Sequence, residues 1–178
     1  IVFSPDSKHV AYLAKLGKKW VVVIDEVESK EYQEPSGLLG FLKYRIVFSP
    51  DSQRVAFLAS LGKKWLMVVD REGGKGYDDI VNDSIIFSSD SKHVAYRAKL
   101  GKKWLVVVDG VESKEYDEAG SIVFSPDSKR VAYLAKLGKK WLVVVDAAEG
   151  KGYDDIGKDS IIFSPDSQHV AYRAKLGK

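Results

Sequence analysis

One segment is written four times in full and a fifth time in part, and this repetition constrains the fold more than any other feature. The signature Ile-Val/Ile-Phe-Ser begins at Ile1, Ile46, Ile85, Ile122 and Ile161. One tryptophan and one tyrosine follow in the same frame in each complete copy, at Trp20, Trp65, Trp104 and Trp141 and at Tyr32, Tyr77, Tyr116 and Tyr153. A period of about 40 residues is typical of arrays whose units bury their hydrophobic faces against one another.

A second, longer period lies on top of the first. Copies one and three share Val-Glu-Ser-Lys-Glu-Tyr at 27–32 and 111–116, whereas copies two and four share Gly-Lys-Gly-Tyr-Asp-Asp-Ile at 74–80 and 150–156. The pattern indicates that a block of two copies was duplicated. Because the copies differ irregularly and one carries an insertion, natural amplification is favoured over a designed consensus array.

Each copy is predicted to form four short strands joined by tight turns. In the third copy the strand-forming runs are 85–88, 93–100, 104–108 and 113–117, which are mostly rich in β-branched and aromatic residues. Ser-Pro-Asp-Ser turns and the residues Gly101 and Asp109-Gly110 separate such runs, since these residue types favour turns. Four strands per period, with no helical periodicity, predict an all-β fold, a β-propeller of four-stranded antiparallel blades.

We place one propeller domain over 1–178, with blades at approximately 1–45, 46–84, 85–121 and 122–160 and a two-stranded partial fifth blade at 161–178. Alternate residues of the run 104–108 are expected to face opposite neighbouring blades. Three interpretations of the partial blade are open. It belongs to a longer propeller, or to a five-bladed ring whose last blade lacks its outer strands, which we favour, or it mediates self-association into a larger ring or array.

The motif Phe-Ser-Pro-Asp-Ser-Lys-Arg-Val-Ala-Tyr at 124–133 resembles the WD40-like (PD40) repeat of TolB-type propellers. Similar repeats occur in the propeller domains of prolyl-oligopeptidase-like proteins. The resemblance covers essentially the whole chain and implies a propeller fold, a periplasmic or extracellular location if it carries that far, and no catalytic motif. Those families have glycine where this chain has serine, and serine is expected to tolerate the turn less well. The serines concerned are Ser7, Ser52, Ser91, Ser128 and Ser167.

Composition and motifs exclude several function classes. The 178 residues carry 28 basic and 25 acidic side chains, a net charge of +3, which by itself is too even to predict nucleic-acid or anionic-membrane binding. The absence of cysteine excludes disulfides and thiolate metal sites. No apolar run approaches the roughly 20 residues of a membrane-spanning helix. No nucleophile-elbow, phosphate-loop, zinc-helix or dinucleotide-binding motif occurs, so the sequence predicts a protein that is not an enzyme and uses no cofactor.

Repeated charged positions are interpreted as structural. His9, His93 and His169 share a repeat position with Arg54 and Arg130, so they are predicted to be polar strand entries rather than metal ligands. The aspartates that recur in turns are assigned to turn formation rather than to calcium binding.

The hairpin lysines are expected to be solvated tips whose charge is offset by acidic residues in the loops that lead to the next copy. An anion-binding crown for nucleic acid or acidic lipid is the alternative. The lysines are Lys15, Lys18, Lys19, Lys63, Lys64, Lys99, Lys102, Lys103, Lys136, Lys139 and Lys140, and the acidic residues are Asp78, Asp79, Asp117, Glu118, Asp154 and Asp155.

One segment breaks the repeat. The first copy runs through 33–45 where the third copy has only 117–121, and the longer segment contains several apolar side chains. An exposed apolar loop on a polar rim is a candidate partner contact; the alternative is a loop that folds back and buries its own leucines. The candidate contact residues are Leu38, Leu39, Phe41, Leu42 and Tyr44.

These observations favour a non-catalytic β-propeller scaffold that binds a protein or peptide, whose identity the sequence does not reveal. One alternative is an accessory propeller of a prolyl-oligopeptidase-like hydrolase whose catalytic domain is absent. Another is a glycan-binding propeller that stacks sugars on tryptophan and tyrosine rings. The glycan hypothesis requires exposed tryptophans, whereas the sequence places them in the most apolar strand.

Overall fold

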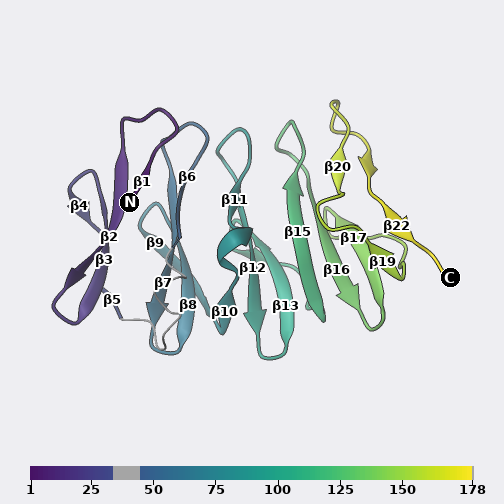
Figure 1. Ribbon diagram of the computed structural model, residues 1–178, viewed down its shortest axis with the longest axis horizontal. Helices are drawn as coiled ribbons and strands as arrows, with labels where there is room; N and C mark the ends of the chain where they lie inside the picture. Colours follow the sequence, from purple (N-terminus) through teal and green to yellow (C-terminus); the bar gives the residue numbers. More distant parts are fainter. Residues whose placement is uncertain (34–44, 178) are drawn as a thin grey trace. The chain divides into compact units, whose positions relative to one another are not determined.

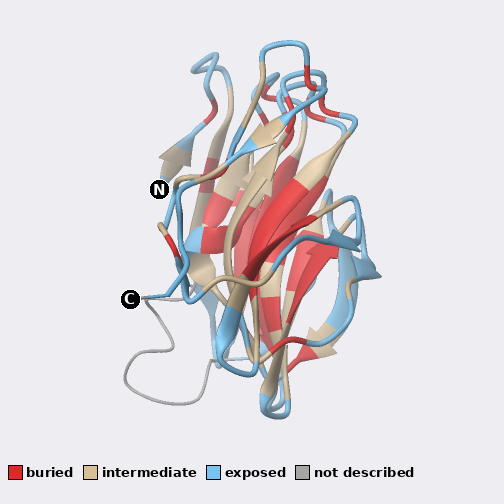
Figure 2. Cartoon of the chain, turned by 90° about the vertical axis from the view of Figure 1, so that its right-hand side faces the viewer, coloured by how far each residue is buried: buried red, intermediate tan, exposed pale blue. Residues whose placement is uncertain are grey.

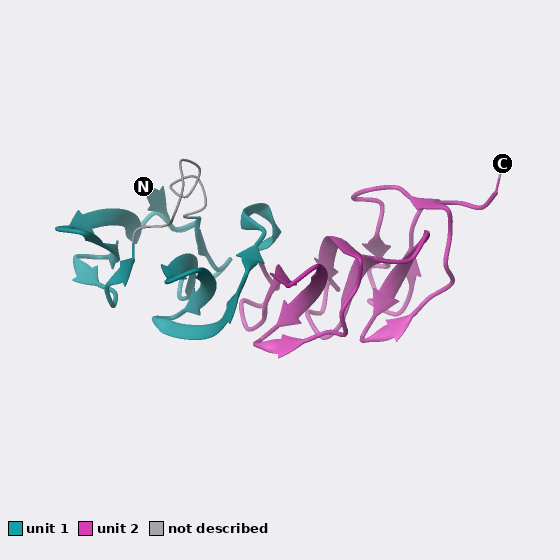
Figure 3. Ribbon diagram, turned by 90° about the horizontal axis from the view of Figure 1, so that it is seen from below, with its two compact units in different colours: residues 1–85 teal, residues 86–178 magenta. Residues whose placement is uncertain are grey.

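A computed structural model describes residues 1–33 and 45–177 of the chain. The chain divides into two compact units, Ile1–Ile85 and Ile86–Lys178, which Figure 3 distinguishes by colour. Within the described residues the only helical segment is the single turn η2 (Asn82–Ser84), and all other regular structure is antiparallel sheet. None of the helical structure found there is long and apolar enough to cross a lipid bilayer.

Unit 1 contains two four-stranded sheets in which each strand pairs with the next along the chain (Figure 1). Blade 1 consists of β1 (Val2–Phe3), β2 (Val10–Leu16), β3 (Lys19–Ile24) and β4 (Val27–Glu28). A further short strand, β5 (Tyr32–Gln33), continues the outer edge of blade 1 by pairing with β3. Blade 2 consists of β6 (Ile46–Phe48), β7 (Val55–Leu61), β8 (Lys64–Val69) and β9 (Glu72–Tyr77). The short strand β10 (Asp79–Ile80) follows blade 2.

Unit 2 repeats the arrangement. Blade 3 consists of β11 (Ile86–Phe87), β12 (Val94–Leu100), β13 (Lys103–Val108) and β14 (Val111–Glu112). Blade 4 consists of β15 (Glu118–Phe124), β16 (Val131–Leu137), β17 (Lys140–Val145) and β18 (Ala148–Glu149). The partial blade 5 consists of β19 (Asp155–Ile156) paired with β22 (Ala174–Lys175) and β20 (Ile162–Phe163) paired with β21 (Val170–Ala171). Each complete repeat forms one four-stranded antiparallel sheet, which is the structure of a propeller blade. The predicted all-β fold class is confirmed.

Two details of the predicted strands are wrong. The outer strand of blade 3 was expected over 113–117 but occupies Val111–Glu112, with only an isolated bridge between Trp104 and Tyr116 beyond it. The cause is Ser113, whose hydroxyl accepts the N–H of Val106 at 3.0 Å and donates to the Lys114 carbonyl at 2.8 Å, so the chain leaves the strand there.

The acidic segments after the outer strands are not loops. β15 begins at Glu118 and β19 covers Asp155–Ile156, and each pairs with the second strand of the blade that follows. Their short, polar sequences predict loops. They form strands because a strand of the next blade offers them backbone hydrogen-bonding partners.

The cores lie between successive blades. Unit 1 buries Ala11 and Val22 of blade 1 against Phe57 and Val68 of blade 2. The alternation that the sequence predicts for 104–108 is seen in the equivalent run of blade 4, where Leu142 and Val144 pack towards blade 3 and Val143 packs towards blade 5. Figure 2 shows the buried residues along the strands and the exposed residues at the turns. Because each blade needs a neighbour on each face, the polar ends of the strands are the accessible parts of the fold.

Candidate functional site

The apolar insertion of the first copy falls on a part of the chain that the structure does not describe. Its candidate contact residues Leu38, Leu39, Phe41, Leu42 and Tyr44 lie outside the described residues. The prediction of a partner contact there stays a prediction, and the site described below is built from other residues.

The Ser-Pro-Asp-Ser segment forms a closed turn, as the sequence predicts. In blade 1, the Ser4 hydroxyl donates to Asp6 Oδ1 at 2.6 Å and accepts the N–H of His9 at 2.9 Å. The same Asp6 oxygen accepts the N–H of Lys8 at 3.1 Å. The Ser4 hydroxyl and then the Lys8 N–H lower the pKa of Asp6, because both stabilise the carboxylate. The carboxylate therefore already has the turn-forming partners that the sequence interpretation assigns to it.

The serine that stands where the families resembled by the motif have glycine has a role that the sequence did not reveal. All five serines have positive φ, from 61° at Ser7 to 66° at Ser52, a conformation that disfavours side chains. The Ser52 hydroxyl accepts the N–H of Asp6 from blade 1 at 3.1 Å. Ser128 and Ser167 accept the N–H of Asp90 and Asp127 in the same way, each at 3.1 Å. We call this contact the turn-end bridge; glycine could not make it.

The strand-entry residues are paired with aspartates. His9 precedes β2 and Asp25 follows β3, so the antiparallel pairing of these strands brings the two residues together, with Nδ1 and Oδ2 2.6 Å apart. Arg54 Nε and Asp70 Oδ2, at the same positions of blade 2, are 2.7 Å apart. Histidine and arginine thus play one structural role, which agrees with the predicted polar strand entry. The Val10 N–H, followed by His9, lowers the pKa of Asp25.

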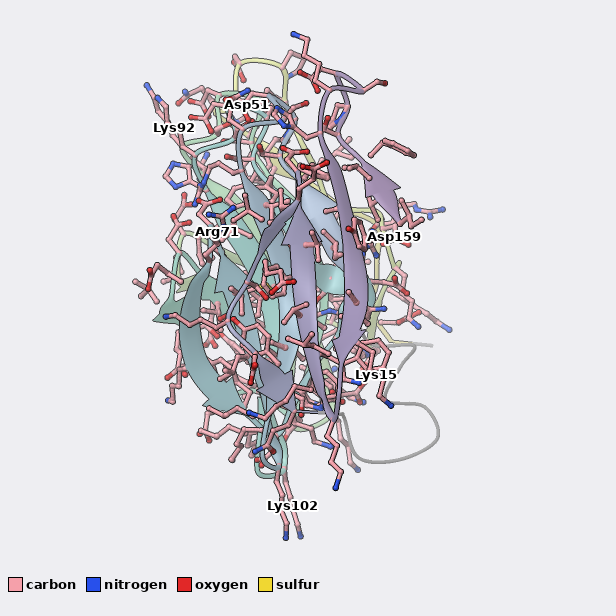
Figure 4. The ribbon with its side chains drawn as sticks, turned by 90° about the vertical axis from the view of Figure 1, so that its left-hand side faces the viewer. Lys15, Asp51, Arg71, Lys92, Lys102 and Asp159 are labelled. Carbon is pink, nitrogen blue, oxygen red and sulfur yellow. The ribbon has the colours of Figure 1, made fainter. Side chains whose placement is uncertain are left out.

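The turn after the third strand positions one unpaired cation. Asp70 and Arg71 have φ values of 50° and 73°, and the other complete blades repeat this pair of positive angles, which is the signature of a type I′ turn. Blades 3 and 4 place Gly110 and Ala147 where blade 2 has Arg71. Arg71 is exposed (Figure 4), and within the described residues no acidic group pairs with its guanidinium.

These residues surround an open groove of about 470 Å³ between blades 1 and 2. It is lined by His9, Ile24, Asp25, Phe48, Ser52, Gln53, Arg54, Val55, Asp70 and Arg71. Arg54 and Asp70 offset one another's charge, and Asp25 is hydrogen-bonded to the His9 ring and to the Val10 N–H. Arg71 is therefore the one cation of the described lining that has no acidic partner. The groove combines apolar side chains with an available guanidinium, so its chemistry suits a segment that carries a carboxylate or another planar anion.

The predicted charge offset at the hairpins is confirmed in blades 2, 3 and 4. Lys64 pairs with Asp78 at 2.8 Å, Lys103 with Asp117 at 2.6 Å, Lys140 with Asp154 at 2.5 Å and Lys136 with Glu118 at 2.6 Å. In blade 1, Lys19 pairs at 3.2 Å with Glu31, an acidic residue that the prediction did not include. The Asp117 carboxylate also accepts the N–H of Gly138 in the next blade at 2.7 Å. Asp154 does the same for Gly177 at 2.6 Å. We call this second inter-blade contact the hairpin-end bridge.

The tryptophans are half-buried rather than fully exposed or fully buried. An ammonium group lies over three of the rings: Lys15 over Trp20 at 5.5 Å, Lys99 over Trp104 at 5.4 Å and Lys136 over Trp141 at 5.1 Å. Because a cation covers one ring face, these rings are not open platforms for sugar stacking.

Across residues 1–33 and 45–177, no group of three or more acidic or histidine side chains is arranged to hold a metal ion.

Comparisons with known proteins give a fold likeness only. No family model matches the chain, and no curated protein matches it. TolB from Acinetobacter baumannii aligns at 17% identity over 98% of this chain and 48% of its own, with a TM-score of 0.45. The β-propeller domain of the Trilobed protease from Pyrococcus furiosus aligns at 13% identity over 92% and 61%, with a TM-score of 0.47. A putative TolB from Agrobacterium tumefaciens aligns at 15% identity over 96% and 67%, with a TM-score of 0.44.

The chain thus spans between about half and two thirds of the length of these solved propellers. At such low identity the assignment of blades rests on the sheet pairing of the chain itself, and no residue role is carried over from these proteins.

Proposed function

We propose that this chain is a non-catalytic β-propeller-type binding module and that the groove between blades 1 and 2 receives a protein or peptide segment with an acidic side chain or terminus. The observation that carries the proposal is Arg71, a cation that lines the groove and that no acidic group neutralises among the described residues. Guanidinium groups bind carboxylates through two parallel hydrogen bonds, which gives orientation as well as affinity.

The size and lining of the groove support the proposal. A volume of about 470 Å³ lies within the range of about 300–1,000 Å³ for ligand pockets. Ile24, Phe48 and Val55 supply apolar contact area beside the charge. The type I′ turn holds the Arg71 backbone in a single conformation, so less freedom is lost when a ligand binds.

A non-catalytic role is supported by what the repeated hydroxyl groups do. The Ser4 and Ser49 hydroxyls donate to the aspartate of their own turn at 2.6 Å, and Ser52 accepts the turn-end bridge. His9 is held by Asp25 rather than placed beside a hydroxyl nucleophile. We further propose that the repeats are of the WD40-like (PD40) TolB type, which the Phe-Ser-Pro-Asp-Ser motif supports.

Peptide selection followed by calorimetry tests the groove. A displayed library of random peptides is panned on the protein, and the enriched peptides are measured against wild type, Arg71→Ala and Lys158→Ala. Lys158 is an exposed cation outside the groove, so its replacement is the matched loss of one positive charge. We expect enriched peptides to be acidic, to bind Arg71→Ala at least about tenfold more weakly and to bind Lys158→Ala as they bind wild type.

Two outcomes would contradict the proposal. One is a failure to enrich acidic peptides, and the other is an equal loss of affinity in both variants, which would indicate attraction to net charge only. Replacing the acidic residue of an enriched peptide by its amide should reproduce the effect of Arg71→Ala. The double change should add little, because both remove the same contact.

A further inference from the structure

The hairpin between the second and third strands of each complete blade ends in a Leu-Gly-Lys-Lys tip. In blade 1, Leu16 pairs with Lys19 in register, so Gly17 and Lys18 form a two-residue loop. Gly17 has a φ of 62° and Lys18 has no positive φ, which matches a type II′ turn with glycine in the first central position. The four tips are 16–19, 61–64, 100–103 and 137–140, and we call them the hairpin tips.

The two lysines of each tip differ in their surroundings. The second is ion-paired, as Lys19 is with Glu31. The first is exposed and, within the described part of the chain, has no acidic partner in any of the four tips. Figure 4 shows one of them, Lys102, extending beyond the ribbon. The four unpaired lysines are Lys18, Lys63, Lys102 and Lys139.

Leucine side chains accompany these lysines. Leu16 and Leu61 of unit 1 are 50% and 55% exposed, although a leucine at a solvated turn contributes nothing to the core. Each tip therefore presents an ammonium group in its two-residue loop and, in unit 1, an exposed aliphatic side chain at the residue before that loop.

Neighbouring tips within a unit are held together. The N–H of Gly62 donates to Gln33 Oε1 at 2.8 Å, and Gln33 pairs in register with Lys19 at the base of the previous tip. In unit 2 the hairpin-end bridge of Asp117 joins Lys103 to Gly138. Each unit thus carries a fixed pair of tips, so two ammonium groups approach a surface together and their attractions add.

We propose that the hairpin tips dock on an anionic lipid bilayer surface, with the unpaired lysines against lipid phosphates and carboxylates and the exposed leucines in the headgroup region. Leucine and lysine side by side on an exposed edge is the composition of interfacial membrane contacts. A nucleic acid would be expected to use stacking platforms or a continuous basic groove. Beside three of the four tips, a lysine already covers the tryptophan ring that follows the tip. The proposal is independent of the groove and extends the function beyond peptide binding.

Vesicle co-sedimentation tests the proposal. The protein is mixed at low ionic strength with vesicles of phosphatidylcholine alone or of phosphatidylcholine containing phosphatidylserine. We expect binding only to the anionic vesicles and release by added salt. Each lysine near an anionic surface contributes about fivefold in affinity, so the combined variant Lys18→Gln, Lys63→Gln, Lys102→Gln and Lys139→Gln should bind at least about tenfold more weakly.

A matched variant separates the tips from net charge. The combination Lys8→Gln, Lys92→Gln, Lys129→Gln and Lys158→Gln removes the same charge from exposed positions outside the tips, and it should bind almost as wild type. Leu16→Ser with Leu61→Ser should weaken binding severalfold without changing its salt dependence. All substituted side chains are solvent-exposed or half-exposed, so the fold should persist, as a circular dichroism spectrum would verify.

Three outcomes would overturn the proposal: no binding to anionic vesicles, equal losses in the two four-lysine variants, or tighter binding to single-stranded DNA than to the vesicles. Acidic-peptide binding by the tip variant keeps this test separate from that of the groove, because Arg71 is unchanged in it.

Discussion

The interface between blades 1 and 2 and the interface between blades 3 and 4 use the same repeat but different polar contacts. Both stack a tyrosine that follows the fourth strand edge-on against an aromatic ring of the next blade: Tyr32 on Phe57 at 5.9 Å and Tyr116 on Tyr133 at 6.1 Å. At the hairpin end, the first interface uses the neutral amide of Gln33, whereas the second uses the Asp117 carboxylate between Lys103 and Gly138.

The difference shows which part of an interface is interchangeable. The apolar stacking is common to both interfaces, because burial of large rings supplies most of the free energy. The polar bridge needs only an acceptor for the glycine N–H, so an amide and a carboxylate both serve. Only the carboxylate, however, makes the interface sensitive to acid.

The largest expected loss of stability comes from removing the aromatic ring on which the tyrosine stacks in each interface. Phe57 is fully buried, and Phe57→Ala should reduce the free energy of unfolding by about 3–5 kcal/mol, because a large cavity opens between the blades. Tyr133→Ala should cost a similar amount in unit 2. Urea denaturation followed by tryptophan fluorescence measures both. A loss below about 1 kcal/mol for either variant would contradict the view that the stacked ring dominates its interface.

The next effect concerns the turn-end bridge. Ser52→Ala removes the acceptor for the Asp6 N–H but keeps a side chain at positive φ, so we expect a loss of about 1–2 kcal/mol. Ser52→Gly should lose less, since glycine relieves the backbone strain. Ser7 occupies the equivalent position but is exposed, so Ser7→Ala should change stability by less than about 0.5 kcal/mol. Equal losses of stability in Ser52→Ala and Ser7→Ala would show that the turn-end bridge does not stabilise the fold.

A smaller effect, an increase in stability, is expected when Arg71 in the groove is replaced by glycine. Arg71→Gly places glycine at a φ of 73° and should raise the thermal midpoint slightly, by the equivalent of about 0.5–1 kcal/mol. Ala147→Gly is the matched change in blade 4, at a φ of 67°, and should behave alike. Only Arg71→Gly should abolish acidic-peptide binding. A stability loss on Arg71→Gly would mean that the arginine stabilises the fold, and the argument for a ligand would fail.

The change with the smallest effect on stability at neutral pH tests whether Asp117, between blades 3 and 4, makes unfolding depend on acid while Gln33, between blades 1 and 2, does not. The Lys103 ammonium, then the Gly138 N–H, lowers the pKa of Asp117 in the folded protein. A lowered folded-state pKa gives stability that is present above the unfolded-state pKa of about 3.9 and is lost as pH falls through the folded-state pKa. Asp117→Asn should therefore reduce the acid dependence of unfolding, and Gln33→Asp should add acid dependence to unit 1. Thermal melts across acidic pH values measure both, and unchanged profiles would contradict this assignment.

Much of the fold could be predicted because its determinants are local. Turn residues such as Pro5 and Gly17 act through their own backbone angles, and the alternating run from Trp141 to Val145 acts through strand geometry. The pairing of Lys64 with Asp78 was also predictable, since the same lysine and aspartate recur in the second, third and fourth copies. The groove was not predicted, because Arg71 differs from Gly110 and Ala147 by a single substitution whose importance appears only beside Phe48 and Arg54.

The sequence by itself determined the repeat, the four strands of each blade and the turns between them, because these depend on residues close together along the chain. The tertiary structure alone decided which repeated polar groups hold blades together and which are available to a ligand. Ser52 and Asp6 are 46 residues apart and meet only after two blades stack. Strand pairing within one blade explains why Lys18 and Lys19, adjacent in sequence, differ: Lys19 reaches Glu31 at the edge of its own blade, whereas Lys18 points into solvent.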